Sequence, residues 1–273
     1  MSERLLRVSN IANPKRIVAF AGSKQSGKNS SANFVAGTLL YSYYYIESFQ
    51  LTRDGILMNG VSRQVNNVAP KFVKIYHWAD ALKEFVAQTF GIPLPLLYGT
   101  DQDKDTPTQL KWENMPNVIN SKSLQASVSA HLKRKGEMLS VSQRDKTLSL
   151  IYHEKGNMSI REVLQYFGSD ICRVMFHNCW VQALESRILR EKPQVALIAD
   201  TRFDNELEAV RDWGGLCVKL NRQIKRDGHK SENGIVSFTD WSAIVSNEHT
   251  DEIRDFCQVL IKALKPTGVF NEL

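Results

Sequence analysis

Gly22-Ser-Lys-Gln-Ser-Gly-Lys-Asn-Ser30 is the stretch of sequence that decides the fold. It follows an apolar run at 17–21, which is typical of a buried strand, and it precedes a helical pattern through Phe34, Val35 and Leu39. A glycine loop between a strand and a helix is the context of a phosphate-binding loop, in which backbone N–H groups and a lysine hold phosphates. The sequence therefore predicts a nucleotide site made by Gly22, Ser23, Lys24, Gln25, Ser26, Gly27, Lys28, Asn29 and Ser30.

The residue after the loop lysine departs from the usual pattern. A Ser or Thr hydroxyl normally stands there and holds magnesium, whereas this chain has Asn29, followed by Ser30. An amide oxygen is a poorer magnesium ligand, but Mg²⁺ keeps several waters and tolerates few protein ligands. We therefore expect both residues at a metal position. The alternative is a glycine- and serine-rich turn with a solvated lysine.

The composition is that of an ordinary globular chain. Its 273 residues are 42% hydrophobic, which is ample for a packed core. No apolar run has bilayer-spanning length and no secretory signal follows Met1, so we expect a cytoplasmic protein without a membrane partner. The widely spaced cysteines are expected to be buried, reduced thiols and not zinc ligands: Cys172, Cys179, Cys217 and Cys257.

The formal net charge of +6 suits a protein that handles anions, either nucleic acid or phosphorylated small molecules. The basic cluster at 133–135 is most simply a solvated loop. The residues from 222 to 235 are either an ordinary polar loop or a lid whose charged groups gather over phosphates and exclude water. The candidate lid residues are Arg222, Arg226, His229 and Glu232.

Apolar strands alternate with helical patterns, which predicts an α/β fold with a parallel sheet of about five strands. The expected strands lie at 17–21, 72–78, 194–199, 216–220 and 241–245. The helical patterns after the first two strands end at about 39 and at Gly91, and others cover 203–213 and a final stretch from 253 to 264.

The middle of the chain is less regular. From about 92 to 157 the sequence is polar with only short apolar stretches, and we interpret it as an insertion over the active site with one or two short helices, or as a segment without regular structure. Ser159 and Glu162 then form a capping box for a helix that we expect Gly168 to end. A longer helix is expected from Asp170 to before Pro193, with Val174 among its inward-facing residues.

Ionisable residues collect after the third expected strand. Asp200 directly follows the buried run, where an acid can hold magnesium through water, and Arg202 can neutralise charge on a transferring phosphoryl group. For Asp204 and Glu206 a functional role stands beside a structural one, in which Asp204 caps the next helix and Glu206 lies in its first turn.

Two further polar sets are candidates for a second substrate. Arg161, Gln165, Asp170 and Arg173 stand on consecutive helices, where a guanidinium can grip a phosphate and an amide can read a base edge. The alternative is a solvated helix face with an Asp170–Arg173 pair. Asp80 and Lys83 follow the second expected strand, with Asp80 acting either on a substrate or as a helix cap.

Taken together, several segments resemble the deoxynucleoside monophosphate kinases of tailed bacteriophages. The segments that carry the resemblance are 22–30, Ala79-Asp-Ala-Leu-Lys83, 159–170, Trp180, Ala199-Asp-Thr-Arg-Phe-Asp-Asn-Glu206 and 227–232. They span most of the chain apart from about 92–157. The resemblance implies one P-loop kinase domain over 1–273, with a three-layer fold like that of the nucleoside monophosphate kinases, the insertion at 92–157 and a lid at 222–235.

The resemblance also implies a reaction, the transfer of the terminal phosphate of ATP to a deoxynucleoside monophosphate with Mg²⁺. Lys28 and the loop would hold the ATP phosphates, Asn247 would lie near the adenine, and Arg202 would assist at the transferring group. Asn29, Ser30 and Asp200 would be the metal residues. The acceptor residues would be Asp80, Lys83, Arg161, Gln165, Asp170, Trp180, Arg202 and Glu206.

Two other functions stay open on the residues alone. A P-loop kinase with a small-molecule or polynucleotide-end acceptor would use the same loop and lid, and a nucleic-acid-binding module regulated by a nucleotide would explain the basic balance. The resemblance favours small-molecule substrates without a stable nucleic-acid partner. A homodimer and the identity of the accepted bases are left open.

Overall fold

The computed structural model describes residues 16–23, 25–52, 55–59, 71–122, 130, 151–222, 235–246 and 253–271, and the chain divides into two compact units. The first unit comprises Met1–Trp78 and Val181–Leu273, and the second comprises Ala79–Trp180. The predicted arrangement of one kinase domain with an insertion and a lid stays a prediction. In the described residues, no helix combines the length and the apolar character that spanning a bilayer requires.

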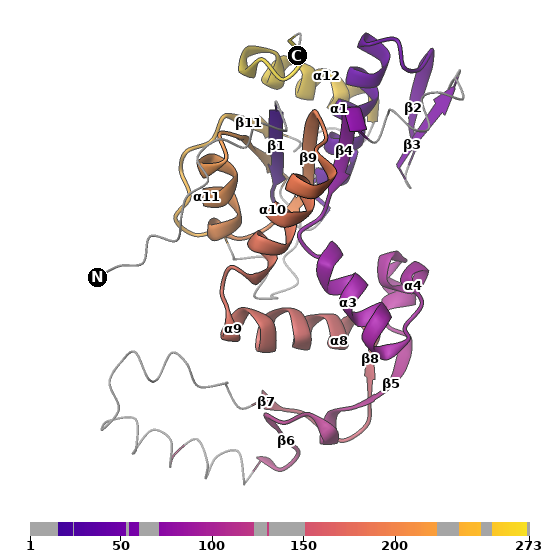
Figure 1. Ribbon diagram of the computed structural model, residues 1–273, viewed down its shortest axis with the longest axis vertical. Coiled ribbons are helices and arrows are strands. Elements are labelled where there is room, and N and C mark those ends of the chain that lie inside the picture. The colour runs from indigo at the N-terminus through magenta and orange to yellow at the C-terminus, as the bar shows by residue number, and fades with distance from the viewer. Residues whose placement is uncertain are drawn as a thin grey trace. The chain divides into compact units, whose positions relative to one another are not determined.

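A five-stranded parallel sheet forms the centre of the first unit (Figure 1). Its strand order is β11-β10-β1-β9-β4, and every neighbouring pair is parallel. The bounds are β1 Arg16–Ala21, β4 Val73–Tyr76, β9 Val195–Thr201, β10 Leu216–Asn221 and β11 Ala243–Ser246. The α/β fold with five strands is thus confirmed, although the last strand begins at Ala243 and not at 241.

Helices cover both faces of this sheet because its strands are apolar on both sides. Along β1, Val18 and Phe20 pack with α1 and α12, whereas Ile17 and Ala19 pack with α10 and α11. Figure 1 shows these two helix pairs on opposite faces of the sheet. The helices are α1 Lys28–Ser42, α10 Cys179–Glu191, α11 Asp204–Asp212 and α12 Ile253–Leu264, and the short 3-10 helix η4 Lys265–Thr267 follows the last of them.

The first unit also contains a two-stranded antiparallel sheet that the sequence analysis did not predict. Strands β2 Ser48–Thr52 and β3 Gly55–Asn59 pair with each other, and the Phe49 ring lies 6.1 Å from the ring of Phe34 on α1. All four cysteines are free thiols, but only Cys217 is fully buried. Its burial raises the pKa of the Cys217 thiol to about 12, which makes it unreactive.

The second unit is built from short helices and strands around its own apolar core, in which Leu82, Leu97, Met158 and Tyr166 are buried. The Tyr166 hydroxyl donates a buried hydrogen bond of 2.7 Å to Asn117 Oδ1. The elements in chain order are α3 Asp80–Phe90, α4 Leu94–Tyr98, α5 Asp101–Lys104, β5 Pro107–Lys111, η1 Trp112–Asn114, β6 Val118–Ile119, β7 Ile151–Tyr152, β8 Asn157–Ser159, α8 Ile160–Gln165, η2 Tyr166–Cys172 and α9 Arg173–Met175. Within the described residues, the predicted insertion contains two short helices, α4 and α5, where one or two were expected, together with short strands that were not predicted.

The expected stop at Gly168 is wrong. α8 continues without a break into η2, a π-helix, and then into α9. Gly168 is present for packing, because a Cβ there would lie 2.7 Å from Leu82 Cδ2. The helix expected from Asp170 to before Pro193 is interrupted where Phe176 is extended (φ −151°), and Val174 is 36% exposed instead of facing inward. Its second half is confirmed as α10, which ends before Pro193.

Candidate active site

The phosphate loop joins β1 to α1, and its two glycines are required by the backbone. Gly22 has φ +156°, and a Cβ there would stand 2.6 Å from the carbonyl oxygen of Leu220 on β10. Gly27 has φ +96° and occupies the N-cap of α1, where no side chain caps the helix. The α1 N-terminus therefore directs backbone N–H groups into the loop, which is the arrangement that binds phosphate.

Lys28 is the first residue of α1 and lies over the loop. Its side chain is only 7% exposed, and its Nζ donates to the carbonyl oxygens of Gly22 at 2.9 Å and Ser23 at 2.6 Å. The positive charge is thus held within the loop that the sequence analysis assigned to phosphates. Asn29 is exposed and Ser30 is half-buried on the same helical turn. Lys24 lies outside the described residues.

The carboxyl end of β9 lies beside this loop. β1 and β9 are parallel neighbours and Ala21 pairs with Thr201, so the residues that follow Ala21 and Thr201 lie at the same edge of the sheet. Asp200 Oδ1 accepts a hydrogen bond of 2.9 Å from the backbone N–H of Trp78, which lies in the turn after β4. Asp200 and Arg202 thus stand at the edge of the sheet that carries the loop.

Trp78 holds this edge of the sheet, and the sequence analysis did not single it out. Its indole N–H donates a hydrogen bond of 3.1 Å to the hydroxyl of Thr201, and both side chains are buried. A tryptophan just after one strand and a threonine that ends the neighbouring strand give only a weak signal, because either residue is ordinary at a strand. Together they fix the end of β9, from which Asp200 projects.

Glu206 and Asp204 have structural partners. Glu206 is 1% exposed, and its Oε2 accepts the backbone N–H groups of Arg202 at 2.9 Å and Phe203 at 3.2 Å. It therefore anchors the start of α11, and its proposed contact with substrate stays a prediction.

The capping role considered for Asp204 is wrong, because Phe203 holds the N-cap position and the Asp204 carboxylate accepts from the backbone of 236–238 instead. Partial burial of the carboxyl acts to raise the pKa of Asp204. The hydrogen bonds from Ser237, Val236 and Phe238 outweigh it and hold this pKa below its usual value.

Arg222 is the first residue after β10 and contacts the phosphate loop. Its Nη1 donates to the carbonyl oxygen of Gln25 at 3.4 Å, so one candidate lid residue reaches the loop. Gln25 itself adopts the left-handed conformation, with φ +61°. The other candidate lid residues and the candidate adenine contact lie outside the described residues: Arg226, His229, Glu232 and Asn247.

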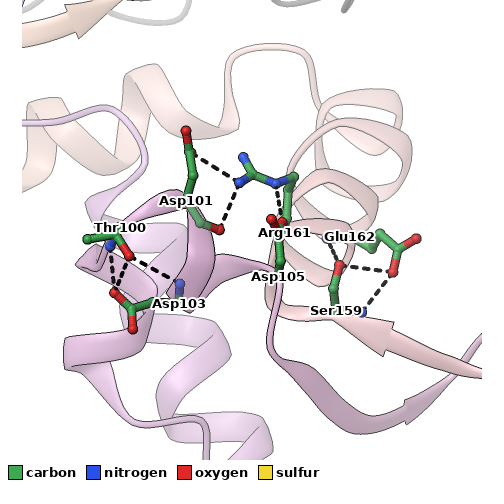
Figure 2. A network of polar contacts seen from close by, with 7 residues as sticks. All are labelled: Thr100, Asp101, Asp103, Asp105, Ser159, Arg161 and Glu162. Carbon is green, nitrogen blue, oxygen red and sulfur yellow. Dashed lines mark hydrogen bonds and ion pairs between the residues drawn. The ribbon is translucent and has the colours of Figure 1, made fainter.

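In the second unit, Arg161 lies in the first turn of α8 and is paired with two acids (Figure 2). Its Nε donates to Asp105 Oδ1 at 2.9 Å, and its Nη2 donates to Asp101 Oδ1 at 3.0 Å. The hydrogen bond to Asp105 is the main reason that the pKa of Arg161 lies above its usual value. The predicted capping box is confirmed, since Ser159 Oγ accepts from the N–H of Glu162 and Glu162 Oε2 accepts from the N–H of Ser159.

The other candidate acceptor residues of this unit follow on the same continuous helix or begin the next. Gln165 is the last residue of α8, and Asp170 lies within the π-helix η2, where its charge adds to the burial that raises the pKa of Tyr166. The indole N–H of Trp180 donates a hydrogen bond of 3.0 Å to the carbonyl oxygen of Gly168. π-Helical turns occur frequently at functional sites because they displace side chains from the regular helical spacing.

Asp80 is not the helix cap that was considered for it. Ala79 holds the N-cap position with helical dihedral angles, and Asp80 is the first residue of α3. Its buried carboxylate accepts a hydrogen bond of 2.7 Å from the hydroxyl of Tyr98, and the Lys83 ammonium lies 3.8 Å from the centre of the Tyr98 ring. Tyr98 thus joins two of the candidate residues, and a tyrosine at the end of a short apolar run did not signal this.

Comparison with known proteins adds independent information. The family model described as deoxynucleotide monophosphate kinase matches residues 16–256. A deoxynucleoside-5'-monophosphate kinase of Escherichia phage T5 is 30% identical over 144 residues, which are 47% of this chain and 55% of the T5 protein. A protein of Acanthamoeba polyphaga mimivirus named a deoxynucleotide monophosphate kinase is 24% identical over 128 residues, which are 41% of this chain and 64% of that protein. The matched parts thus span less than two thirds of either relative. Because the family model covers most of the sequence, the chain belongs to the deoxynucleotide monophosphate kinase family.

Proposed function

We propose that this protein is a nucleotide kinase that transfers the γ-phosphate of ATP to deoxynucleoside monophosphates and forms the diphosphates. The observation that carries the proposal is the phosphate loop, in which Lys28 Nζ lies on the carbonyl oxygens of Gly22 and Ser23 beside the end of β9. The family membership and the names of the two relatives support a deoxynucleotide monophosphate as the acceptor.

The donor would be held by the first unit. The backbone N–H groups at the start of α1 and the Lys28 ammonium would bind the outer phosphates of ATP. Lys28 would exchange its bonds to the two loop carbonyls for bonds to phosphate oxygens, so its charge is already at the loop when ATP arrives. Arg202 and Arg222 would add positive charge directly after the two strands that flank β1.

Magnesium fits the donors on this edge of the sheet. Ser30 offers a hydroxyl oxygen in the first turn of α1 and Asp200 offers a carboxylate at the end of β9, and oxygen donors of this kind suit Mg²⁺. The Trp78 N–H orients the Asp200 carboxylate through Oδ1. When bound, Mg²⁺ would neutralise charge on the phosphates.

The chemistry needs no covalent enzyme intermediate. An oxygen of the acceptor phosphate attacks Pγ of ATP, the bond between Pγ and its bridging oxygen to the β-phosphate breaks, and ADP leaves with that electron pair. Catalysis then consists of positioning and of neutralising charge. In the second unit, Arg161 would bind the phosphate of the monophosphate, with Gln165, Asp170 and Trp180 near the rest of the nucleotide.

The test is an assay of ADP release with each of the four deoxynucleoside monophosphates and their ribose counterparts, with and without Mg²⁺. We expect Mg²⁺-dependent turnover with at least one deoxynucleotide. Lys28→Ala should reduce turnover at least about a thousandfold while the protein stays folded, since a preorganised cation at the transferring phosphate is lost. Lys71→Ala, which removes an exposed lysine of the same unit, is the matched control. A panel without ADP release, or near-normal turnover of Lys28→Ala, would overturn the proposal.

A further inference from the structure

The guanidinium of Arg161 is held at three points by the segment that contains α5 (Figure 2). Its Nε donates to Asp105 Oδ1, and its Nη2 donates both to Asp101 Oδ1 and to the backbone oxygen of Asp101 at 3.1 Å. These partners lie 56 and 60 residues before Arg161 in the sequence. Two neighbouring nitrogens of the guanidinium thus point into the α5 segment.

The remaining nitrogen is the one that a ligand can use. Among the described residues, Arg161 Nη1 has no hydrogen-bond or ion-pair partner, so its N–H groups are directed away from the two acids. The Arg161 side chain as a whole is 33% exposed. A phosphate oxygen approaching Nη1 would meet a guanidinium whose plane is already fixed.

Both sides of this contact are themselves held in place. Thr100 and Asp103 form a capping box that fixes the first turn of α5, where Asp101 lies. The Ser159–Glu162 capping box fixes the first turn of α8, where Arg161 lies. A backbone hydrogen bond of 3.0 Å from Ile160 to Thr106 then joins the two segments.

We propose that Asp101 and Asp105 are positioning residues that hold Arg161 for the phosphate of the acceptor monophosphate. The inference rests on the proposed function, because that phosphate is the ligand it names. A long arginine side chain loses conformational entropy when it is ordered. The two acids would order this side chain before the substrate arrives, so its conformational entropy would not be lost when the phosphate binds.

Charge and geometry predict opposite effects, which makes the proposal testable. The two carboxylates carry more charge than the one guanidinium, so charge alone would weaken the binding of an anionic phosphate. Asp105→Asn removes the charge but keeps an oxygen that accepts from Arg161 Nε. Asp105→Ala removes both, so a comparison of the two variants separates positioning from charge.

The experiment measures kcat and KM for a deoxynucleoside monophosphate and, separately, KM for ATP. Asp105→Ala should raise KM for the monophosphate about three- to tenfold, the effect of a solvent-open, charge-assisted hydrogen bond, and should leave KM for ATP unchanged. In Asp105→Asn, KM for the monophosphate should lie well below that of Asp105→Ala. Gln102→Ala is the matched control, because Gln102 lies exposed on the same short helix and takes no part in the bonds to Arg161 or in the capping box.

The outcomes separate the inference from the proposed function. If Arg161→Ala raises KM for the monophosphate and Asp105→Ala does not, the positioning role is overturned and the role of Arg161 stands. If Asp105→Ala and Asp105→Asn both lower this KM, charge and not geometry is decisive, and the inference is again wrong. If Arg161→Ala has no effect on it, both assignments fall. If Asp105→Ala does not fold, Asp101→Ala serves instead, because it removes one contact to Nη2 and keeps the contact to the backbone oxygen.

Discussion

Replacing Gly22 with alanine tests whether the phosphate loop depends on the close approach of β10. Two penalties would act together in this variant. Gly22 has φ +156°, and the new Cβ would stand 2.6 Å from the Leu220 carbonyl oxygen and 2.6 Å from Ser26 Oγ. Because the Leu220 oxygen belongs to the backbone of a central strand, it cannot move aside as a flexible side chain would.

The size of the effect follows from these two contributions. The backbone conformation costs about 1–2 kcal/mol for a residue with a side chain, and forcing an additional carbon into a packed region costs about 1–3 kcal/mol. The sum is about 2–5 kcal/mol in the free energy of unfolding. For a chain of 273 residues the unfolding entropy makes 1 kcal/mol equal to about 2 °C, so the melting temperature should fall by roughly 4–10 °C.

Gly55→Ala is the matched control, because Gly55 has a similar φ of +145° and no atom of the described residues lies within 4 Å of the position a Cβ would take. It should show the conformational penalty alone, a loss of about 2–4 °C. Thermal melting of both variants, followed by circular dichroism with and without ATP and Mg²⁺, gives the comparison. Equal losses in the two variants, or an unchanged melting temperature for Gly22→Ala, would refute the role of the contact with Leu220.

Two other perturbations test individual side chains of the first unit. The pKa of Asp204 is lowered in the folded chain, so its contribution to stability is present above the unfolded pKa and is lost as the pH falls through the folded pKa. The melting temperature should therefore fall less steeply below about pH 4 for Asp204→Asn than for the unmodified protein, and parallel curves would contradict this. Asn29→Asp places a carboxylate on the exposed first turn of α1, so half-maximal activity should need several-fold less Mg²⁺. Loss of activity would show that this side chain does not face the metal.

The sheet and the loop of the first unit could be predicted because their signals are local. The apolar run before Asp200 and the glycine spacing around Lys28 each lie within about ten residues, and the register of parallel strands then places them at one edge. The start of α8 was predictable for the same reason, since Ser159 and Glu162 are three residues apart.

The missed features depend on partners that are distant in the sequence or on packing. No pattern around Arg161 indicates its bonds to Asp101 and Asp105 in a polar segment far upstream. Gly168 has the sequence context of a helix end, but its small size is needed beside Leu82 and the helix continues. Local propensity was overridden here by tertiary contact.

The acids near the phosphate loop show why residue type alone does not assign function. Asp200, Asp204 and Glu206 stand within seven residues of one another and were all candidates for charge chemistry. Glu206 is buried and accepts hydrogen bonds from two backbone N–H groups at the start of α11. Asp204 accepts hydrogen bonds from the backbone of 236–238 and so joins α11 to that segment. Asp200 lies near the end of β9, and its Oδ1 accepts a hydrogen bond from the backbone N–H of Trp78. Its position at the edge of the sheet beside the loop, and not its charge, is the reason that we propose it as the acid of this group that serves a metal and its phosphates.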